Sequence, residues 1–335
     1  MITRREALQS GIALTAWAAG PERLSAAAGA DAGPDLRLWY TRPAETWTEA
    51  LPIGNGRLGA MIFGGVARER LQLNEDTLYA GGPYDPSSAE ALEALPRVRE
   101  LIGAGKYLEA QTLANEKLMG RPMRMPSYQT IGDLVLTFGA SSMASDYTRE
   151  LDLDSAVTTV RYTRQDVTYT RETFASAVDQ VIVVRLTASR PGAITFQASF
   201  ETPMPGAASA DGDTLVLAGT NTSQQGIPAA LRYDARVKVL NEGGALRARD
   251  GEIVVEGADA TVLLIAMATN YRRFDDVSGD PEAANRARLE SAVKRRYRQL
   301  LDAHLAEHRA LFRRVSLDLG TTPASQLPTD QRIRA

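Results

Sequence analysis

The chain has 335 residues, of which 24% are charged and 44% are apolar, and 38 Lys and Arg residues nearly balance 41 Asp and Glu residues. These proportions exclude intrinsic disorder and collagen-like structure, and the net charge of −3 favours neither a nucleic acid nor an anionic membrane as a partner. The absence of cysteine excludes disulfides, thiolate metal sites and cysteine nucleophiles. Because the chain has only two histidines, a histidine-rich metal site is not expected. No apolar run in the sequence reaches the roughly 18 residues of a membrane span.

The first 32 residues have the features of an export signal. Arg4 and Arg5 stand near the start, residues 11–19 are weakly apolar, and small residues in A-x-A triplets follow up to Ala32. A charged start, an apolar stretch and a small-residue cleavage zone are typical of a signal peptide, and paired arginines are typical of the twin-arginine type. We therefore expect export to the periplasm or the extracellular space. The alternative is a short N-terminal helix.

From residue 33 to residue 275 the sequence predicts an antiparallel β-sandwich. Short segments rich in Val, Thr, Tyr and Phe recur with turn clusters between many of them: 133–138, 157–163, 167–174, 180–187, 195–200, 214–218, 235–240, 253–256 and 261–267. Regular short strands of this kind are typical of a sandwich rather than of a parallel βαβ sheet. Residues 181–184 and 262–265 are apolar on both faces, which predicts central strands that are covered on both sides.

One helical insert interrupts these strands. Pro96 is expected to open a helix that carries Val98 and Leu101 on one face, and residues 106–119 continue with helical spacing up to the stop signal at Gly120. We expect the insert to pack on the sandwich and to contribute no chemistry.

Residues 276–320 are predicted to form a helical linker. Asp280, Pro281 and Glu282 provide a capping side chain, a proline at the first helical position and an acid in the first turn. Apolar residues then repeat at helical spacing up to Val315, which predicts one long helix or two shorter ones with an apolar stripe that needs a partner surface. Residues 316–320 resemble a short strand that returns to the sheet.

Two short motifs have a functional and a structural interpretation. Residues 54–59 match the dinucleotide fingerprint G-x-G-x-x-G, which requires a following helix, but residues 60–63 resemble a strand and Gly64 comes soon after. A glycine-rich turn between strands is therefore expected, and no cofactor. His304 and His308 share a helix face, but a zinc site of the H-E-x-x-H type needs Glu directly after the first histidine. Packing against a neighbour is expected, and no metal.

Two adjacent carboxylates, Glu75 and Asp76, follow an alternating segment. Glycosidases place two carboxylates on opposite sides of a sugar, but adjacent residues in a strand point to opposite faces, so we assign no catalytic role to this pair. Asn74 or Asp76 is expected to cap a turn. Five aromatic residues of the same region either stack on a sugar or belong to the core: Trp39, Tyr40, Trp47, Tyr79 and Tyr84.

The same segments resemble the opening of glycoside hydrolase family 95, which consists mainly of α-L-fucosidases. The resemblance rests on L-W-Y at 38–40, W-T-E-A-L-P-I-G-N-G-R-L-G-A-M at 47–61, F-G-G at 63–65, L-Q-L-N-E-D-T-L at 71–78 and G-G-P at 81–83. It continues with Y-Q at 128–129, G-D-L at 132–134, R-E-T-F-A-S at 171–176 and residues 304–320, so that it covers nearly the whole mature chain.

The resemblance implies a mostly β chain: an antiparallel, supersandwich-like β-sandwich with a helical insert and C-terminal linker helices. In the family, a large (α/α)6 barrel and a small C-terminal β domain follow, and residues 321–335 resemble the truncated start of that barrel. The catalytic residues of the family lie in or after the barrel, so none is carried over to this chain. The complete enzyme is implied to hydrolyse terminal α-L-fucosides with inversion, with a fucosylated glycan as substrate, the missing helical barrel domain as partner and no cofactor.

Seven residues of the matching segments are candidates for contact with substrate or with the barrel: Trp47, Glu49, Asn55, Arg57, Asn74, Glu75 and Asp76. An alternative from a different class is a stand-alone carbohydrate-binding or scaffold sandwich without catalysis. A more distant enzyme alternative is the sandwich of the maltose phosphorylase type, which also precedes a helical barrel.

Overall fold

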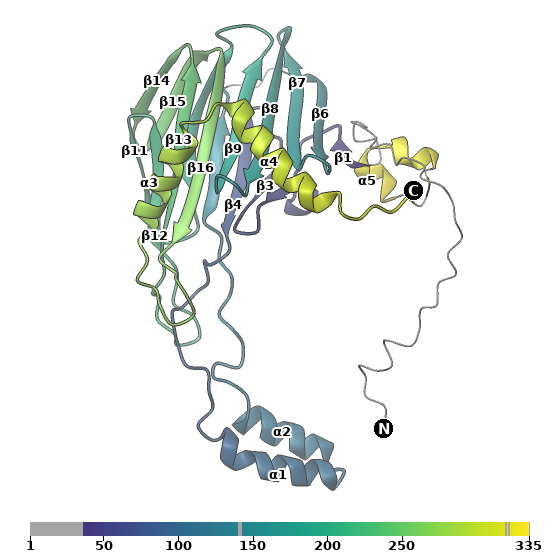
Figure 1. Ribbon diagram of the computed structural model, residues 1–335, viewed down its shortest axis with the longest axis vertical. Helices are drawn as coiled ribbons and strands as arrows, with labels where there is room; N and C mark the ends of the chain where they lie inside the picture. The colour runs from purple at the N-terminus through teal and green to yellow at the C-terminus, as the bar shows by residue number, and fades with distance from the viewer. Residues whose placement is uncertain (1–35, 140–142, 319, 321, 335) are drawn as a thin grey trace, which may run out of the picture.

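A computed structural model describes residues 36–139, 143–318, 320 and 322–334. The predicted export signal, residues 1–32, lies outside the described residues. The described chain is mostly β, with two antiparallel sheets that stack as a sandwich (Figure 1). None of its helices, within the described ranges, is long and apolar enough to cross a membrane.

The larger sheet has nine strands. In spatial order these are β1 (Arg37–Tyr40), β6 (Ser145–Asp152), β7 (Val157–Arg164), β8 (Val167–Ser176), β9 (Val181–Ala188), β16 (Ala260–Thr269), β13 (Arg232–Glu242), β12 (Thr214–Thr220) and β11 (Gly206–Asp211). Every neighbouring pair is antiparallel. The predicted central strands are confirmed, because β9 and β16 lie side by side in the middle of this sheet.

The smaller sheet has seven strands. In spatial order these are β14 (Ala245–Arg249), β15 (Glu252–Ala258), β10 (Ile194–Glu201), β5 (Gly132–Thr137), β4 (Arg68–Glu75), β3 (Leu58–Ile62) and β2 (Leu51–Gly54). Residues such as Leu73, Leu134 and Phe196 face Leu263 and Ile265 of the larger sheet and form the main core. Alternation places every second side chain of a strand on this inner face, which explains the pattern in the sequence.

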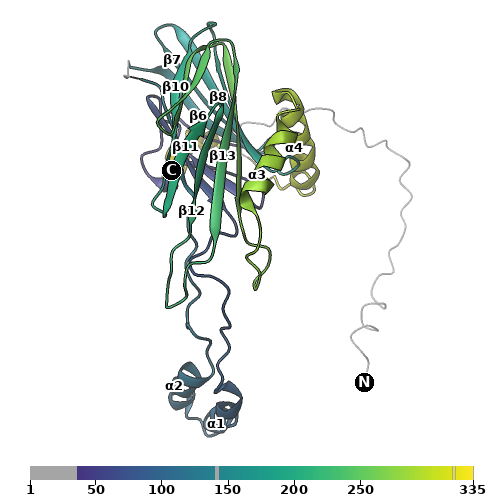
Figure 2. The same ribbon diagram turned by 90° about the vertical axis from the view of Figure 1, so that its left-hand side faces the viewer.

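Two linker helices cover the outer face of the larger sheet, α3 (Pro281–Ala292) and α4 (Tyr297–Phe312) (Figures 1 and 2). The predicted start of α3 is confirmed: the Ala283 backbone N–H donates to the Asp280 carboxylate over 3.1 Å, and Pro281 occupies the first turn. Leu289 and Leu300 pack with Phe174 in a second core. Full burial of each such side chain is worth about 1.5–3 kcal/mol, so the sandwich holds the linker firmly.

The two histidines of α4 serve packing, as expected. The Nε2 atom of His304 donates to the Ser155 carbonyl over 2.8 Å, and that of His308 donates to the Leu153 carbonyl over 2.9 Å. The His304 ring packs on Phe174 with a centroid distance of 4.7 Å. These contacts tie α4 to the β6–β7 turn.

The helical insert differs from expectation. Helix α1 (Ala91–Gly103) begins before Pro96, which lies inside it, and α2 (Tyr107–Lys117) follows. The expectation that the insert packs on the sandwich is wrong: both views show the hairpin projecting beyond one end of the sheets (Figures 1 and 2). The reason is that Val98 and Leu101 of α1 pack against Ala110 of α2, so the insert has a small core of its own.

The expected return strand is also absent: residues 316–318 and 320, which are described, have no strand structure. Leu317 is 80% exposed, so this segment has no sheet partner that would bury it. The chain instead continues through a 3₁₀ turn (Pro323–Gln326) to α5 (Thr329–Arg332). Helix α5 lies against β1, where the Trp39 backbone N–H donates to Thr329 Oγ1 over 2.9 Å and Arg332 donates to the Arg37 carbonyl over 2.8 Å.

Candidate functional site

The glycine-rich segment forms the turn between β2 and β3, as predicted. Gly54 and Gly59 pair across this hairpin, and Gly56 has a φ of +90° that favours glycine. The Asn55 carboxamide oxygen accepts hydrogen bonds from the backbone N–H groups of Arg57 (3.1 Å) and Leu58 (2.7 Å), which holds the turn closed. Because a strand rather than a helix follows, this segment lacks the helix N-terminus that a dinucleotide pyrophosphate needs.

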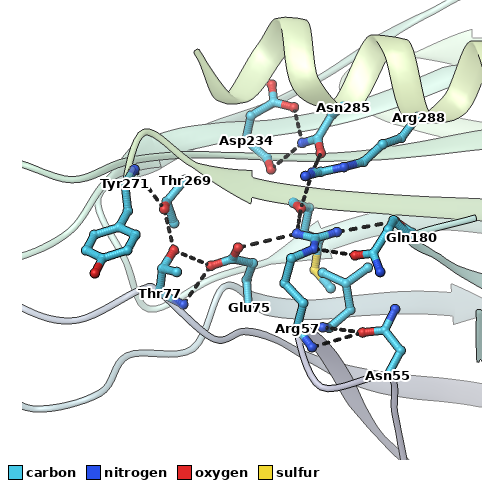
Figure 3. A network of polar contacts seen from close by, with 12 residues as sticks. Asn55, Arg57, Glu75, Thr77, Gln180, Asp234, Thr269, Tyr271, Asn285 and Arg288 are labelled. Atoms are coloured by element: carbon cyan, nitrogen blue, oxygen red, sulfur yellow. Dashed lines mark hydrogen bonds and ion pairs between the residues drawn. The ribbon is translucent and has the colours of Figure 1, made fainter. Parts of the chain in front are cut away.

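Arg57 extends from this turn of the smaller sheet to the larger sheet (Figure 3). Its Nε atom donates to Gln180 Oε1 over 2.6 Å, and its Nη1 atom donates to the Met267 carbonyl over 2.7 Å. The same Nη1 atom lies 3.3 Å from Glu75 Oε1. Arg57 therefore joins the β2–β3 turn, the β8–β9 turn and β16 with one side chain.

Glu75 ends β4 on the inner face, and its side chain is 4% exposed. Its second carboxylate oxygen accepts hydrogen bonds from the Thr77 backbone N–H (2.9 Å) and hydroxyl (2.6 Å). The expectation that Asn74 or Asp76 caps this turn is wrong. The buried Glu75 carboxylate caps it instead, because Thr77 donates both its backbone N–H and its hydroxyl to Glu75. Burial raises the pKa of Glu75 and lowers the pKa of Arg57, while their mutual attraction opposes both shifts.

The same network reaches the linker helix α3. Arg288 donates to the Met267 carbonyl over 3.2 Å, so this carbonyl accepts from Arg288 and from Arg57 (Figure 3). Asn285, which is fully buried, donates to the backbone carbonyl and the carboxylate of Asp234, each over 2.8 Å. Sequence reasoning missed Asn285 and Arg288, because both stand in a largely polar helix whose spacing does not single them out.

The remaining candidates lie outside this network. Asp76 is exposed, and Asn74 is a half-buried residue whose side chain lies on the face of β4 opposite to Glu75. Trp47 and Glu49 lie in a 3₁₀ turn (Trp47–Glu49), where Trp47 is largely exposed. Glu49 accepts from Arg42 over 2.6 Å, which lowers the pKa of Glu49 to about 2. Of the seven candidates, the structure therefore joins the side chains of Asn55, Arg57 and Glu75 into one network through the turn.

A pocket of about 510 Å³ lies beside this network and shares Thr77 with it. Four aromatic residues line it: Tyr79, Tyr84, Tyr271 and Phe274. Tyr79 and Tyr84 belong to the aromatic group noted in the sequence, whereas Trp39 and Tyr40 lie in β1 and Trp47 lies in its own turn. Tyr271 and Phe274 were missed because they are distant in sequence. In the described part of the chain, no group of three or more His, Cys, Asp or Glu residues is placed to hold a metal ion.

The arrangement of Arg57 and Glu75 is suited to holding the two sheets and α3 in register. Both oxygens of Glu75 accept hydrogen bonds within the protein, and Asp76, the carboxylate that follows it, is its direct neighbour in the chain. Glycosidic hydrolysis requires an acid and a base on opposite sides of the sugar, which this pair does not provide. The aromatic pocket beside this pair instead offers flat rings on which a ligand can stack.

Comparison with known proteins places the chain among glycoside hydrolases. It is 35% identical to "Alpha-L-fucosidase 2" of Arabidopsis thaliana over 94% of this chain and 41% of that protein. It is 31% identical to "Probable alpha-fucosidase A" of Aspergillus niger over 84% of this chain and 38% of that protein. The chain thus spans about two fifths of the length of these curated relatives.

Among solved structures, "Putative kojibiose phosphorylase from human microbiome" superposes with a TM-score of 0.45 and 9% identity, over 84% of this chain and 38% of that one. Residues 38–273 match the family model described as "Glycosyl hydrolase family 65, N-terminal domain". This match covers the two sheets from β1 to β16. The chain therefore belongs to the family of glycosyl hydrolase family 65 N-terminal domains.

Proposed function

We propose that this chain is the N-terminal portion of an α-L-fucosidase-like enzyme of glycoside hydrolase family 95. The observation that carries the proposal is the 35% identity to the Arabidopsis fucosidase over 94% of the chain. The complete enzyme hydrolyses terminal α-L-fucosides of glycans with inversion: an acid protonates the leaving oxygen while a base activates water on the opposite face of the sugar.

Within that enzyme, the chain supplies the sandwich and the linker, and the following part supplies the acid and the base. The geometry supports this division of roles, because Glu75 is enclosed by Arg57 and Thr77 and is not free to reach a sugar. The sandwich on its own is therefore inactive. The alternative of a stand-alone scaffold or carbohydrate-binding sandwich requires no catalytic partner at all.

A chimera distinguishes an N-terminal portion of an enzyme from a stand-alone sandwich. Residues 33–335 replace the matching N-terminal part of the Arabidopsis fucosidase, and hydrolysis of a chromogenic α-L-fucoside is measured. We expect activity from the chimera, and no activity from either residues 33–335 alone or the Arabidopsis remainder alone. Turnover by residues 33–335 alone that is lost on Glu75→Gln contradicts the division of roles, and a folded but inactive chimera favours the scaffold alternative.

We also propose that residues 1–32 direct export of the chain by the twin-arginine route. The support is the sequence pattern of Arg4 and Arg5 before an apolar stretch and small residues. The double substitution Arg4→Lys and Arg5→Lys is expected to trap the precursor in the cytoplasm, whereas the unaltered chain is cleaved between residues 28 and 32. Unchanged export of the double variant contradicts the twin-arginine assignment.

A further inference from the structure

The aromatic pocket presents flat rings to solvent without any charged side chain among them. Phe274 is 79% exposed and Tyr271 is 41% exposed, and both line the pocket with Tyr79 and Tyr84. The other lining residues are Thr77, glycines, prolines and aliphatic or methionine side chains, so every lining residue is neutral. Because the lining has no charged side chain to pair with a charged group, this pocket suits an uncharged ligand with flat surfaces that stack on the aromatic rings.

The walls of the pocket are built from segments far apart in the chain and are held in place by buried amides. Asn221, which is 2% exposed, donates to the Tyr79 carbonyl over 2.7 Å and accepts from the Leu231 backbone N–H over 3.1 Å. Asn270, which is 3% exposed, donates to the Val277 carbonyl over 2.7 Å and accepts from the Arg232 N–H over 2.8 Å. Such buried, satisfied amides fix the loops in advance, which reduces the entropy that a ligand loses on binding.

The close approach of two loops at Gly81 and Gly82 also fixes the pocket. Gly81 has a φ of +76°, and an added Cβ would lie 2.9 Å from Ile227 Cγ2. An added Cβ at Gly82 would lie 2.4 Å from the Ala230 Cβ. These two glycines let the Tyr79–Tyr84 wall lie directly against the loop before β13, so the cavity exists before any ligand arrives.

We propose that this pocket binds a neutral saccharide, with a pyranose ring stacked on Tyr271 and Phe274. The apolar C–H face of a sugar suits an aromatic ring, and the hydroxyls of three tyrosines can exchange hydrogen bonds with sugar hydroxyls. A volume of about 510 Å³ accommodates one or two sugar units, within the usual size range of ligand pockets. The choice of a saccharide rests on membership of a glycoside hydrolase family and on this lining, and it does not require fucose specificity.

Saturation-transfer difference NMR and titration calorimetry on residues 33–335 test the proposal. The probes are lactose, 2′-fucosyllactose and the charged 3′-sialyllactose. We expect binding of the two neutral probes and weaker binding of the charged one. Phe274→Ala and Tyr271→Ala should each weaken binding roughly 3- to 10-fold, because each removes one stacking ring.

An exposed aromatic residue outside the pocket provides a matched control. Tyr107→Ala removes a largely exposed ring from the helical hairpin and should leave affinity unchanged. Because Phe274 is largely exposed, its truncation removes little buried surface, and an unchanged melting temperature verifies that the fold is intact.

Two results overturn the proposal: no saturation transfer from either neutral probe at about 10 mM, or binding that neither pocket variant weakens. Equal binding of lactose and 2′-fucosyllactose supports the saccharide site and counts only against a preference for fucose. The binding experiment tests the pocket and the chimera experiment tests the proposed enzyme, so either proposal can fail while the other stands.

Discussion

The ion pair of Arg57 and Glu75 costs desolvation energy on both sides. Arg57 is 21% exposed at its side chain and Glu75 is 4% exposed, so neither retains much contact with water. Burial of two charges stabilises a protein only where further hydrogen bonds satisfy them, and here Gln180 and Thr77 provide these. The pair therefore fixes how the two sheets meet and adds little net stability. Loss of one partner is destabilising, because it leaves the other charge buried without compensation.

Two substitutions at Glu75 distinguish what its charge and what its hydrogen bonds contribute to the free energy of unfolding. Glu75→Ala is expected to lower the free energy of unfolding by about 3 kcal/mol, because it leaves the Arg57 guanidinium buried without its carboxylate. Glu75→Gln keeps one acceptor oxygen, which can serve Thr77 but not Arg57 as well, and should cost less than Glu75→Ala, about 1–2 kcal/mol. Urea unfolding measures both, with Asp76→Asn at the exposed neighbouring position as the control. Equal losses for Glu75→Ala and Glu75→Gln contradict this interpretation.

At the scale of elements, the linker helix α4 is held at its C-terminal end by a carboxylate clasp. Asp154 accepts from Arg313 Nε over 2.6 Å and from Arg309 Nε over 3.0 Å. The hydrogen bond from Arg313 is the main cause of a pKa of Asp154 below its ordinary value of 3.8. The Asp154 side chain is 7% exposed, so the clasp is shielded on the sandwich side.

The clasp should make stability depend on pH in one direction. The pKa of Asp154 is lower in the folded chain, so its contribution is complete above the ordinary value and is lost as pH falls through the folded-state pKa. Asp154→Asn is expected to cost about 2 kcal/mol at pH 7 and progressively less below about pH 4. Thermal unfolding of both proteins over this range measures the difference. A difference that stays constant down to pH 2 contradicts the proposed linkage.

The helical hairpin α1–α2 behaves as a separate small unit. The Arg121 backbone N–H donates to the Pro86 carbonyl over 3.0 Å, so the two ends of the insert already lie side by side. Replacement of residues 88–119 by a two-glycine connection is expected to change the melting temperature by less than about 2 °C, because the hairpin buries its apolar residues in its own core. A fall of more than about 5 °C, measured by calorimetry, would show that the sandwich depends on the hairpin.

Most strands away from the sheet edges were predictable from the sequence, although β6 (Ser145–Asp152) was missed, and the outermost strands were not predicted. The four strands at the edges of the two sheets are β1, β11, β14 and β2, and none was singled out beforehand. Strands β11 and β14 are almost entirely exposed, so their residues need not alternate between apolar and polar types. Strand β2 does alternate, but four residues are too few to distinguish it from a turn.

At the scale of the whole molecule, the apolar stripe of the linker is covered unevenly. The sandwich buries Leu289, Leu300 and His304, as the need for a partner surface predicted. Beyond them, Leu311 and Phe312 are partly exposed, and Val315 is 84% exposed. Exposed apolar side chains so near one another in the chain favour association or aggregation.

We expect residues 33–335 to self-associate through this end of the linker. The double substitution Leu311→Ser and Val315→Asp should shift the chain toward a monomer in size-exclusion chromatography with light scattering, because it removes the apolar contact surface. Leu92→Ser, which replaces an exposed leucine of the hairpin, is the control.

Hydrogen exchange gives an independent measurement of the same surface. Amides of α3 and of the first half of α4 should exchange slowly, and those near residue 315 should exchange quickly. A monomeric unaltered chain with slow exchange up to residue 315 contradicts the expectation and favours a self-contained sandwich.

Several local features of this protein followed from its sequence. Residue patterning predicted most of the inner strands, with β6 as an exception, Asp280 and Pro281 predicted the start of α3, and the glycines at 54 and 59 predicted a hairpin turn. The tertiary structure alone decided which distant groups meet: Arg57 with the Met267 carbonyl, 210 residues away, and Tyr79 with Phe274 around one pocket. The reason is physical. Turn and strand preferences depend on neighbours along the chain, whereas these encounters depend on the order and register of sixteen strands, which no local pattern encodes.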